Sequence, residues 1–188
     1  PPRSTLFPYT TLFRSANPGG WTGYGKNVWG LTASNGPGGF IVKSAQGERK
    51  FHGYTARGAG LDYISDDGTI APTAAGGSIA FAPEIVLPAL MAMKQRYGQY
   101  IYDQYGFVDA FNPSFHTQTA LRTGKLVPDV GWVDTEQLGI DQGPILLMIE
   151  NWRSGFVWNV MKKNPYIRKG LERAGFTGGW LAAEPATP

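Results

Sequence analysis

Residues 139–155, Gly-Ile-Asp-Gln-Gly-Pro-Ile-Leu-Leu-Met-Ile-Glu-Asn-Trp-Arg-Ser-Gly, are the stretch that most clearly decides the fold. From Pro144 onward the apolar side chains recur with the helical period of 3.6 residues, at Ile145, Met148, Ile149, Trp152, Phe156 and Val160. A proline suits the first turn of a helix, and the cations Lys162 and Lys163 suit its C-terminal end. The pattern therefore predicts a long amphipathic helix from residue 144 to about residue 163.

Two further helices are predicted on either side of this one. Pro83 opens a run with a helical period that ends near Gly98, and Pro88 inside that run predicts a kink. Asn164 before a proline is typical of a helix start, and Gly175 is typical of a helix end. Helices are therefore expected to dominate the chain, which predicts a mainly α fold.

The first half of the chain is rich in glycine. Residues 16–82 contain 15 of the 26 glycines, which predicts long Gly-rich loops with a few short strands. Residues 40–42 and 50–52 lie on either side of a glycine turn and predict a short β-hairpin, and residues 66–68, Asp-Asp-Gly, predict a further turn. A second irregular stretch, residues 104–143, carries several aromatic side chains, and loops of that length are usually functional.

The composition excludes several classes of function. Of 188 residues, 17 are Lys or Arg and 14 are Asp or Glu, so a net charge of +3 is too small to favour nucleic acid or an anionic membrane as a partner. The longest apolar run, residues 85–93, is too short for a membrane span. Because the chain has no cysteine and its two histidines, His52 and His116, are far apart, we expect no disulfide, no metal site and no cofactor.

Residues 1–15, Pro-Pro-Arg-Ser-Thr-Leu-Phe-Pro-Tyr-Thr-Thr-Leu-Phe-Arg-Ser, follow neither a helical nor a strand period. Their back-translation matches a sequencing adapter, so we interpret them as a translated artefact of a metagenomic library rather than as natural protein. We expect the native domain in residues 16–182 and a disordered tail in residues 183–188.

Acid–base chemistry in such a chain falls mainly to its carboxylates. Asp141 precedes the predicted helix, where free backbone N–H groups favour an anion, although plain helix capping explains it equally well. Asp109 is flanked by Phe107 and Phe111, and a dry setting would raise its pKa. Glu84 lies in the first turn of a predicted helix, where complementing the helix dipole is the more frequent role.

Aromatic side chains are concentrated in the predicted loops. Exposed rings beside amide and carboxyl groups form the kind of surface that stacks on sugar rings while the polar groups bind hydroxyls. The candidates for such platforms are Trp29, Phe107 and Trp132. The rings on the long helix are instead expected in the core, namely Trp152, Phe156 and Trp158. A nucleic-acid site would need a basic groove beside these rings, which the sequence does not show.

Five motifs occur in order between about residues 21 and 176. They are Trp29-Gly-Leu-Thr-Ala-Ser-Asn-Gly-Pro37, Asp67-Gly-Thr-Ile-Ala-Pro-Thr-Ala-Ala-Gly-Gly77, Phe81-Ala-Pro-Glu84, Tyr105-Gly-Phe-Val-Asp-Ala-Phe-Asn112 and Ile140-Asp-Gln-Gly-Pro-Ile145. Together they resemble the glucoamylase-like domain of bacteria. That family includes endo-β-1,2-glucanases and a domain of cyclic β-1,2-glucan synthases.

The resemblance implies an (α/α)6 toroid whose cleft lies where loops meet helix ends, and inverting hydrolysis of a β-glucan, most directly a β-1,2-linked one. Inversion uses a carboxylic acid and a carboxylate, and the resemblance leaves open which of Asp109, Asp141 and Glu84 plays either role. The substrate-binding residues that it implies on this chain are Trp29, Thr32, Asn35, Phe107, Asn112, Trp132 and Gln142. The family pattern has Asp where this chain has Asn35, so a charge is missing here.

A toroid of six helical hairpins needs well over about 300 residues, so we expect this chain to be the C-terminal part of one, with exposed helix faces and no activity alone. The parent protein is expected to be a periplasmic or secreted glycoside hydrolase whose partner is an oligosaccharide or polysaccharide. Two alternatives stay open. One is a non-catalytic glycan-binding domain, favoured by Asn35, and the other is a glucan transglycosylase domain.

Overall fold

The computed structural model describes residues 16–44, 47–59 and 63–182. Over these ranges the chain forms five α-helices and several small antiparallel sheets, so strands and loops share the fold with the helices to a greater extent than a mainly α prediction implies. The predictions of an artefact in residues 1–15 and of a tail in residues 183–188 lie outside the described residues. The toroid implied by the resemblance stays a prediction.

The strands are short, and most of them form two-stranded sheets. Each two-stranded pair is antiparallel: β1 (Ala33–Ser34) with β4 (Thr55–Ala56), β2 (Phe40–Ser44) with β3 (Gly47–Phe51), β5 (Gly58–Ala59) with β6 (Ile64–Ser65), and β7 (Tyr102–Asp103) with β8 (Gly106–Phe107). Each of these sheets joins consecutive strands except the pair β1–β4, which encloses the β2–β3 hairpin. The three-stranded sheet has the order β10 (Lys125–Val127), β11 (Gly131–Val133), β9 (Phe111–Asn112).

The predicted hairpin and turn are confirmed. Phe40 pairs with Phe51 at one end of the β2–β3 hairpin, and Ser44 pairs with Gly47 at the other. At the second turn, Gly68 has a φ of 79°, a left-handed value that favours glycine, and its N–H donates to Oδ1 of Asp66 at 2.9 Å. Both features follow from local sequence signals alone.

The helices are α2 (Pro72–Gly76), α3 (Pro83–Ile101), α4 (Gly139–Ser154), α5 (Phe156–Lys162) and α6 (Pro165–Arg173), followed by a 3₁₀ turn, η2 (Gly179–Leu181). The start of α3 at Pro83 is confirmed, but the helix passes Gly98 and ends at Ile101. The start of α6 is confirmed as well, because Oδ1 of Asn164 accepts the Tyr166 N–H at 2.9 Å.

The long helix predicted from residue 144 to residue 163 is wrong in its bounds. Helix α4 begins five residues earlier at Gly139 and contains Pro144, and Gly155 separates it from α5. Gly155 has a φ of 70°, the left-handed conformation that commonly ends a helix. The apolar period runs across this glycine, so periodicity alone does not show the break.

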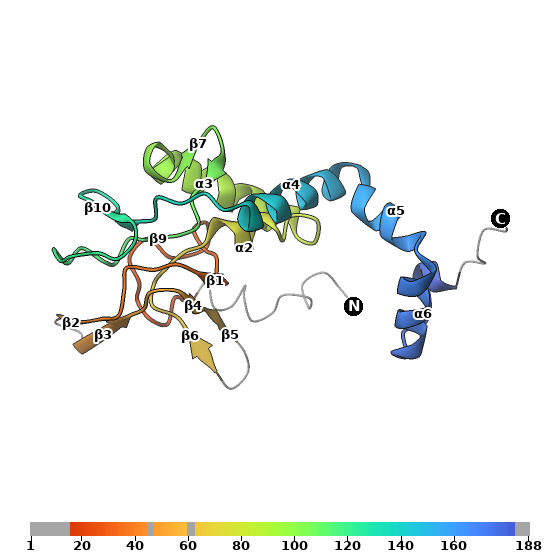
Figure 1. The fold of residues 1–188 in the computed structure, drawn as a ribbon, viewed down its shortest axis with the longest axis horizontal. Helices are drawn as coiled ribbons and strands as arrows, with labels where there is room; N and C mark the ends of the chain where they lie inside the picture. The colour runs from red at the N-terminus through yellow and green to blue at the C-terminus, as the bar shows by residue number, and fades with distance from the viewer. Residues whose placement is uncertain (1–15, 45–46, 60–62, 183–188) are drawn as a thin grey trace.

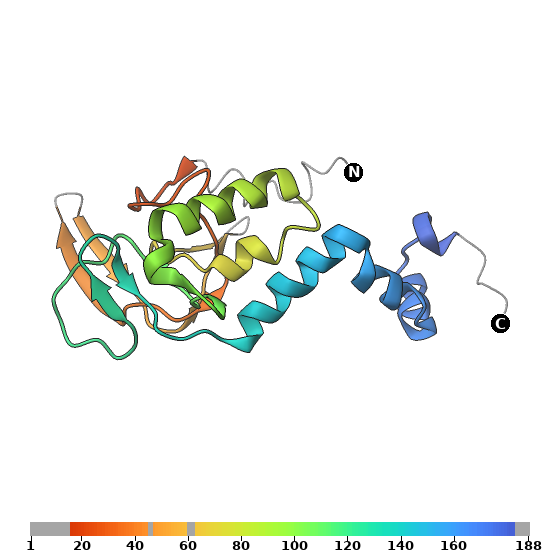
Figure 2. The same ribbon diagram turned by 90° about the horizontal axis from the view of Figure 1, so that it is seen from above.

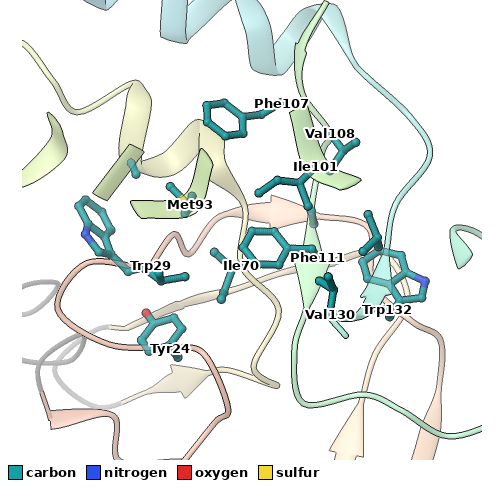
Figure 3. Close-up of a cluster of buried hydrophobic side chains, with 14 of the residues drawn as sticks. Tyr24, Trp29, Ile70, Met93, Ile101, Phe107, Val108, Phe111, Val130 and Trp132 are labelled. Atoms are coloured by element: carbon teal, nitrogen blue, oxygen red, sulfur yellow. The ribbon is translucent and has the colours of Figure 1, made fainter. Parts of the chain in front are cut away.

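The hydrophobic core lies between α3 and the three-stranded sheet. Phe111 from β9 and Trp132 from β11 are fully buried, and Met93 from α3 packs from the other side. In Figure 3, Ile70 lies between Trp29 of the N-terminal loop and the Phe111 ring, and Trp132 lies on the other side of Phe111. Backbone hydrogen bonds in both directions join Ile70 to Phe111, so the segment before α2 is fixed to the sheet.

Helices α4, α5 and α6 form an arm that leaves this core, as Figures 1 and 2 show. Helix α4 packs on α2 through Ile145, while α5 and α6 have no buried residue within the described part of the chain. The prediction that Trp152, Phe156 and Trp158 lie in the core is therefore wrong, because each ring is at least 40% exposed. No described helix combines the length and apolar character that a membrane crossing requires.

Gly30 in the N-terminal loop packs closely against Ala71, in the segment before α2. The Ala71 N–H donates to the Gly30 carbonyl at 3.0 Å, and a Cβ on Gly30 would lie 2.0 Å from the Ala71 carbonyl oxygen. Gly30→Ala is therefore expected to lower the free energy of unfolding by about 1–3 kcal/mol, the range for overpacking. Urea denaturation measures the change.

Gly58→Ala is the matched control, since a Cβ there meets no atom within 4 Å. Its effect on the free energy of unfolding is expected to stay within about 0.5 kcal/mol. Equal losses in the two variants would contradict the close approach at Gly30.

Candidate active site

Asn35, directly after β1, stands at the centre of a cluster of carboxylates. Its backbone N–H donates to Oδ2 of Asp109 at 2.7 Å. Its side-chain Nδ2 donates to Oδ2 of Asp134 at 2.9 Å and to Oε2 of Glu136 at 3.3 Å. One residue therefore gathers three carboxylates that lie 74 or more positions away in the sequence.

The strands bring these carboxylates to one place. Asp109 lies between β8 and β9, and Asp134 follows β11 immediately. The Asp109 N–H donates to the Glu136 carbonyl at 2.9 Å, and the Asp134 N–H donates to the Ala110 carbonyl at 3.0 Å. Because β9 and β11 pair with each other, their continuations run side by side, and both buried aspartates lie at the same end of the sheet.

Asp141 joins the cluster from the first turn of α4. Its side chain is buried and its carboxyl group is within hydrogen-bonding reach of the Asp109 carboxyl. Burial, followed by the charge and hydrogen bond of Asp109, raises the pKa of Asp141 to about 6. Within the described residues, the buried Oδ2 of Asp141 accepts no hydrogen bond. These effects outweigh the helix N-terminus, which favours an anion at this position.

The Asp109 carboxyl also has a raised pKa, as the sequence predicted for a dry setting. Burial is the main cause, and the negative charges of Asp134 and Glu136 add to it. The Asn35 N–H and the positive charge of Arg57 act in the opposite direction. Two coupled carboxyl groups of this kind hold one proton between them over part of the pH range, which suits them to proton transfer near neutral pH.

The loop that carries Asn35 is held by the buried cation Arg57. Its guanidinium pairs with Asp67 through Nε at 2.7 Å and Nη2 at 2.9 Å, and donates to the Ser34 carbonyl at 2.8 Å. It also reaches the Asn35 carbonyl at 3.3 Å. The backbone on both sides of the Asn35 peptide is thus fixed, which aims its N–H at Asp109.

The start of α4 is held against the strand that precedes Asp109. Nε2 of Gln142 donates to the Phe107 carbonyl at 2.6 Å, and Oγ1 of Thr73 donates to the Asp141 carbonyl at 3.0 Å. Gly106 makes room for the amide, since a Cβ there would lie 2.1 Å from Oε1 of Gln142. These contacts set the distance between the two buried carboxyl groups.

The structure brings together Asp109, Asp141, Asn35 and Gln142 among the predicted site residues, and it places Thr32 nearby, where its carbonyl accepts the Arg57 N–H at 3.3 Å. It does not bring Glu84 to this cluster. Glu84 is exposed in the first turn of α3, and its carboxylate has no hydrogen-bond or ion-pair partner among the described residues.

The prediction that Trp29, Phe107 and Trp132 offer exposed platforms is wrong, because all three rings are buried. Trp132 is 0% exposed and its indole N–H donates to the Thr123 carbonyl at 2.9 Å. Asn112 is also buried, and its amide donates to the Asp67 carbonyl and to Thr69 Oγ1. The aromatic side chains of these loops therefore belong to the hydrophobic core, because the loops pack around the small sheet and do not extend into solvent.

Sequence reasoning missed Asp134, Glu136 and Arg57. A signal for the first two exists in Gly131-Trp-Val-Asp-Thr-Glu136, where acidic residues follow an apolar strand directly. Nothing local distinguishes Arg57, since its role depends on partners across several loops. In the part of the chain that the structure describes, no three His, Asp or Glu side chains are arranged to hold a metal ion.

Carboxyl groups gathered where loops meet the start of a helix are the kind of site on which glycoside hydrolases depend. The family model Glycoamylase, described as “Putative glucoamylase”, matches residues 9–165. The chain belongs to this family.

Relatives with assigned activities act on β-1,2-glucans. The chain is 31% identical over 157 residues to an exo β-1,2-glucooligosaccharide sophorohydrolase (non-reducing end) of Parabacteroides distasonis, covering 84% of this chain and 18% of that protein. The endo-β-1,2-glucanase of Chitinophaga pinensis, solved with sophorotriose and glucose, matches with a TM-score of 0.67 and 31% identity over 92% of this chain and 34% of that one.

A β-1,2-glucanase structure from Parabacteroides distasonis matches with a TM-score of 0.63 and 30% identity, over 87% of this chain and 19% of that one. The chain therefore spans about a third or less of the length of these relatives.

Asp141→Asn is expected to stabilise the folded chain at pH 7. The folded-state pKa of about 6 lies above the ordinary value of 3.8, so the folded protein binds this proton more tightly than the unfolded chain. The stability linked to that proton is complete below about pH 4 and is lost as pH rises through 6. Removing the charge is therefore expected to raise the free energy of unfolding at pH 7 by up to about 3 kcal/mol, at about 1.4 kcal/mol per pKa unit.

Urea denaturation of both proteins at pH 5 and pH 7 measures this effect, with Asp129→Asn as a control at an exposed position. The gain from Asp141→Asn is expected to be larger at pH 7 than at pH 5, while the control shows no such difference. A loss of stability at pH 7 would contradict the raised pKa.

Proposed function

We propose that this protein is a glycoside hydrolase that cleaves β-glucan, with β-1,2-linked glucan as substrate. The observation that carries the proposal is the buried carboxyl pair of Asp109 and Asp141, one of which has a pKa of about 6. The β-1,2-glucan activities of the relatives support the linkage. Export to the periplasm or the exterior, where such polymers are met, belongs to the same proposal.

The coupling of the two carboxyl groups limits their roles. Inverting hydrolysis places its acid and its base about 6.5–9.5 Å apart to leave room for a water molecule. Because burial, the charge of Asp109 and a hydrogen bond from its carboxyl group raise the pKa of Asp141, we assign the two groups together to one end of the reaction. Above about pH 6 the Asp141 carboxyl group is ionised and able to accept a proton, which favours the role of the base.

In this scheme the oxygen of a water molecule attacks the anomeric carbon as its proton passes to the Asp109–Asp141 pair. The glycosidic bond breaks, and the leaving oxygen takes a proton from a separate carboxylic acid on the opposite side of the sugar. Glu84 stays a prediction for that acid, since the structure does not place it beside the pair. The proposed base predicts activity that falls as pH decreases below about 6.

Asn35 favours a second candidate, a glycan-binding domain without turnover, because an amide stands where the family pattern has a carboxylate. In the structure this amide donates to the carboxylates of Asp134 and Glu136, and a third carboxylate at position 35 would replace these contacts by repulsion. A transglycosylase is the third candidate, and it differs in its products, which are longer or cyclic glucans without a net gain of reducing ends.

A chimera with a longer relative tests the proposal. In this chimera, residues 16–182 replace the matching third of the Chitinophaga pinensis endo-β-1,2-glucanase. The release of reducing ends from β-1,2-glucan is measured for the chimera and, in parallel, for the 188-residue chain alone. The chimera is expected to release reducing ends, and Asp109→Asn or Asp141→Asn to lower kcat by at least about 100-fold, the usual range for a general base.

Asp129→Asn in the same chimera serves as the control and is expected to leave kcat within twofold. A chimera that is folded by circular dichroism and binds glucan without releasing reducing ends would overturn the hydrolase proposal in favour of glycan binding. Longer or cyclic products would favour the transglycosylase.

A further inference from the structure

Asn35 is followed by Gly36, and the two form the one Asn-Gly pair in the sequence. An asparagine before glycine is prone to deamidation, because glycine has no Cβ to keep its backbone nitrogen away from the side-chain amide carbon. The other asparagines precede valine or tryptophan, which are bulkier, or proline, which has no N–H. Asn35 is therefore the asparagine of this chain that is chemically most open to the reaction.

The reaction is a ring closure followed by hydrolysis. The Gly36 nitrogen bonds to Cγ of Asn35, the bond from Cγ to Nδ2 breaks, and Nδ2 leaves as ammonia with the proton that the Gly36 nitrogen loses. A water molecule then opens the cyclic imide at either carbonyl, which gives aspartate or isoaspartate. Either product carries a carboxylate in place of the amide that donates to Asp134 and Glu136, so the reaction adds negative charge to this cluster.

In the folded protein the reacting groups of Asn35 are held by hydrogen bonds. The leaving nitrogen, Nδ2, donates to Asp134 at 2.9 Å and to Glu136 at 3.3 Å. Nη1 of Arg57 donates to the Asn35 carbonyl at 3.3 Å, which holds the peptide between Asn35 and Gly36 in one orientation. Because ring closure turns this peptide and releases Nδ2 from its acceptors, the closed loop opposes the reaction.

Arg57 also packs against Gly36. This glycine is buried, and a Cβ on it would collide with Nη2 of Arg57 and with the His52 carbonyl. Among the described residues, the Gly36 N–H donates no hydrogen bond, so packing against the guanidinium holds the nucleophilic nitrogen in place. Arg57 is itself held by Asp67, through Nε at 2.7 Å. This ion pair must open before the peptide between Asn35 and Gly36 can turn.

We propose that Asn35 is a deamidation site whose reaction is controlled by the ion pair between Arg57 and Asp67. While the pair is closed, Asn35 stays an amide. When the loop opens locally, the Gly36 nitrogen reaches Cγ and the conversion becomes permanent. The inference does not rest on the proposed function, because the reaction needs only water.

Peptide mapping by mass spectrometry measures the conversion of each asparagine during incubation of the 188-residue chain at neutral pH. In the chain unfolded by guanidinium chloride, Asn35 is expected to convert at least about tenfold faster than Asn27 and Asn159, which precede the stiff side chain of valine. In the folded chain, Asn35 is expected to convert at least about tenfold more slowly than in the unfolded chain. Asn35 that converts no faster than Asn27 when unfolded would overturn the site.

Arg57→Lys tests the control by the ion pair, because an ammonium group keeps the charge but cannot bind Asp67 and the loop carbonyls through one planar group. It is expected to speed the conversion of Asn35 in the folded chain at least about threefold. Arg153→Lys, at an exposed arginine, is expected to leave the rate within about twofold. Val86→Ala lowers the overall stability from the buried face of α3 and is expected to act less than Arg57→Lys. A folded Arg57→Lys protein that converts no faster than Val86→Ala overturns the control.

Hydrogen exchange supplies a second measurement, which needs no variant. The Asn35 N–H donates to Asp109, so its exchange in the unmodified chain reports the opening of the same loop. The protection of this N–H is expected to match the ratio of the unfolded to the folded conversion rate within about threefold. Strong protection of the Asn35 N–H together with equal conversion of Asn35 in the folded and unfolded chains would overturn the proposal.

Discussion

The buried ion pair between Arg57 and Asp67 is the interaction on which the rest of the site depends. Both side chains are 1% exposed, and the guanidinium binds both carboxylate oxygens. Removing one partner of such a pair costs about 3–5 kcal/mol, because the other charge is left buried without compensation. Since Arg57 also donates to the carbonyls of Ser34 and Asn35, one cation fixes the loop that presents the Asn35 N–H to Asp109.

This framework explains how carboxyl groups that repel one another stay together. The Asn35 amide and backbone N–H supply donors to three of them, and the paired strands β9 and β11 hold Asp109 and Asp134 at the same end of the sheet. Burial of Asp141 beside Asp109 lowers the free energy of unfolding at neutral pH. It also raises the pKa of Asp141 to about 6, so that this carboxyl group can accept and release a proton near neutral pH. Stability is commonly given up in this way at functional sites.

Local signals predicted the parts of the fold that depend on few neighbours, such as the β2–β3 hairpin, the start of α3 at Pro83 and the cap at Asn164. Periodicity did not show the break at Gly155, and it placed Trp152 in a core that the described residues do not form. The site was predicted in part: Asp109, Asp141 and Asn35 carried motif signals, whereas Arg57 and the burial of Trp132 depend on contacts between distant loops.

The central claim, that Asp109 and Asp141 form one coupled proton-binding unit, is tested most directly by NMR titration of the side-chain carboxyl carbons in the 188-residue chain. We expect a pKa of about 6 for Asp141 and a lower pKa when Asp109→Asn removes the neighbouring charge. An Asp141 that titrates near its ordinary value of 3.8, and that does not respond to Asp109→Asn, would contradict the account.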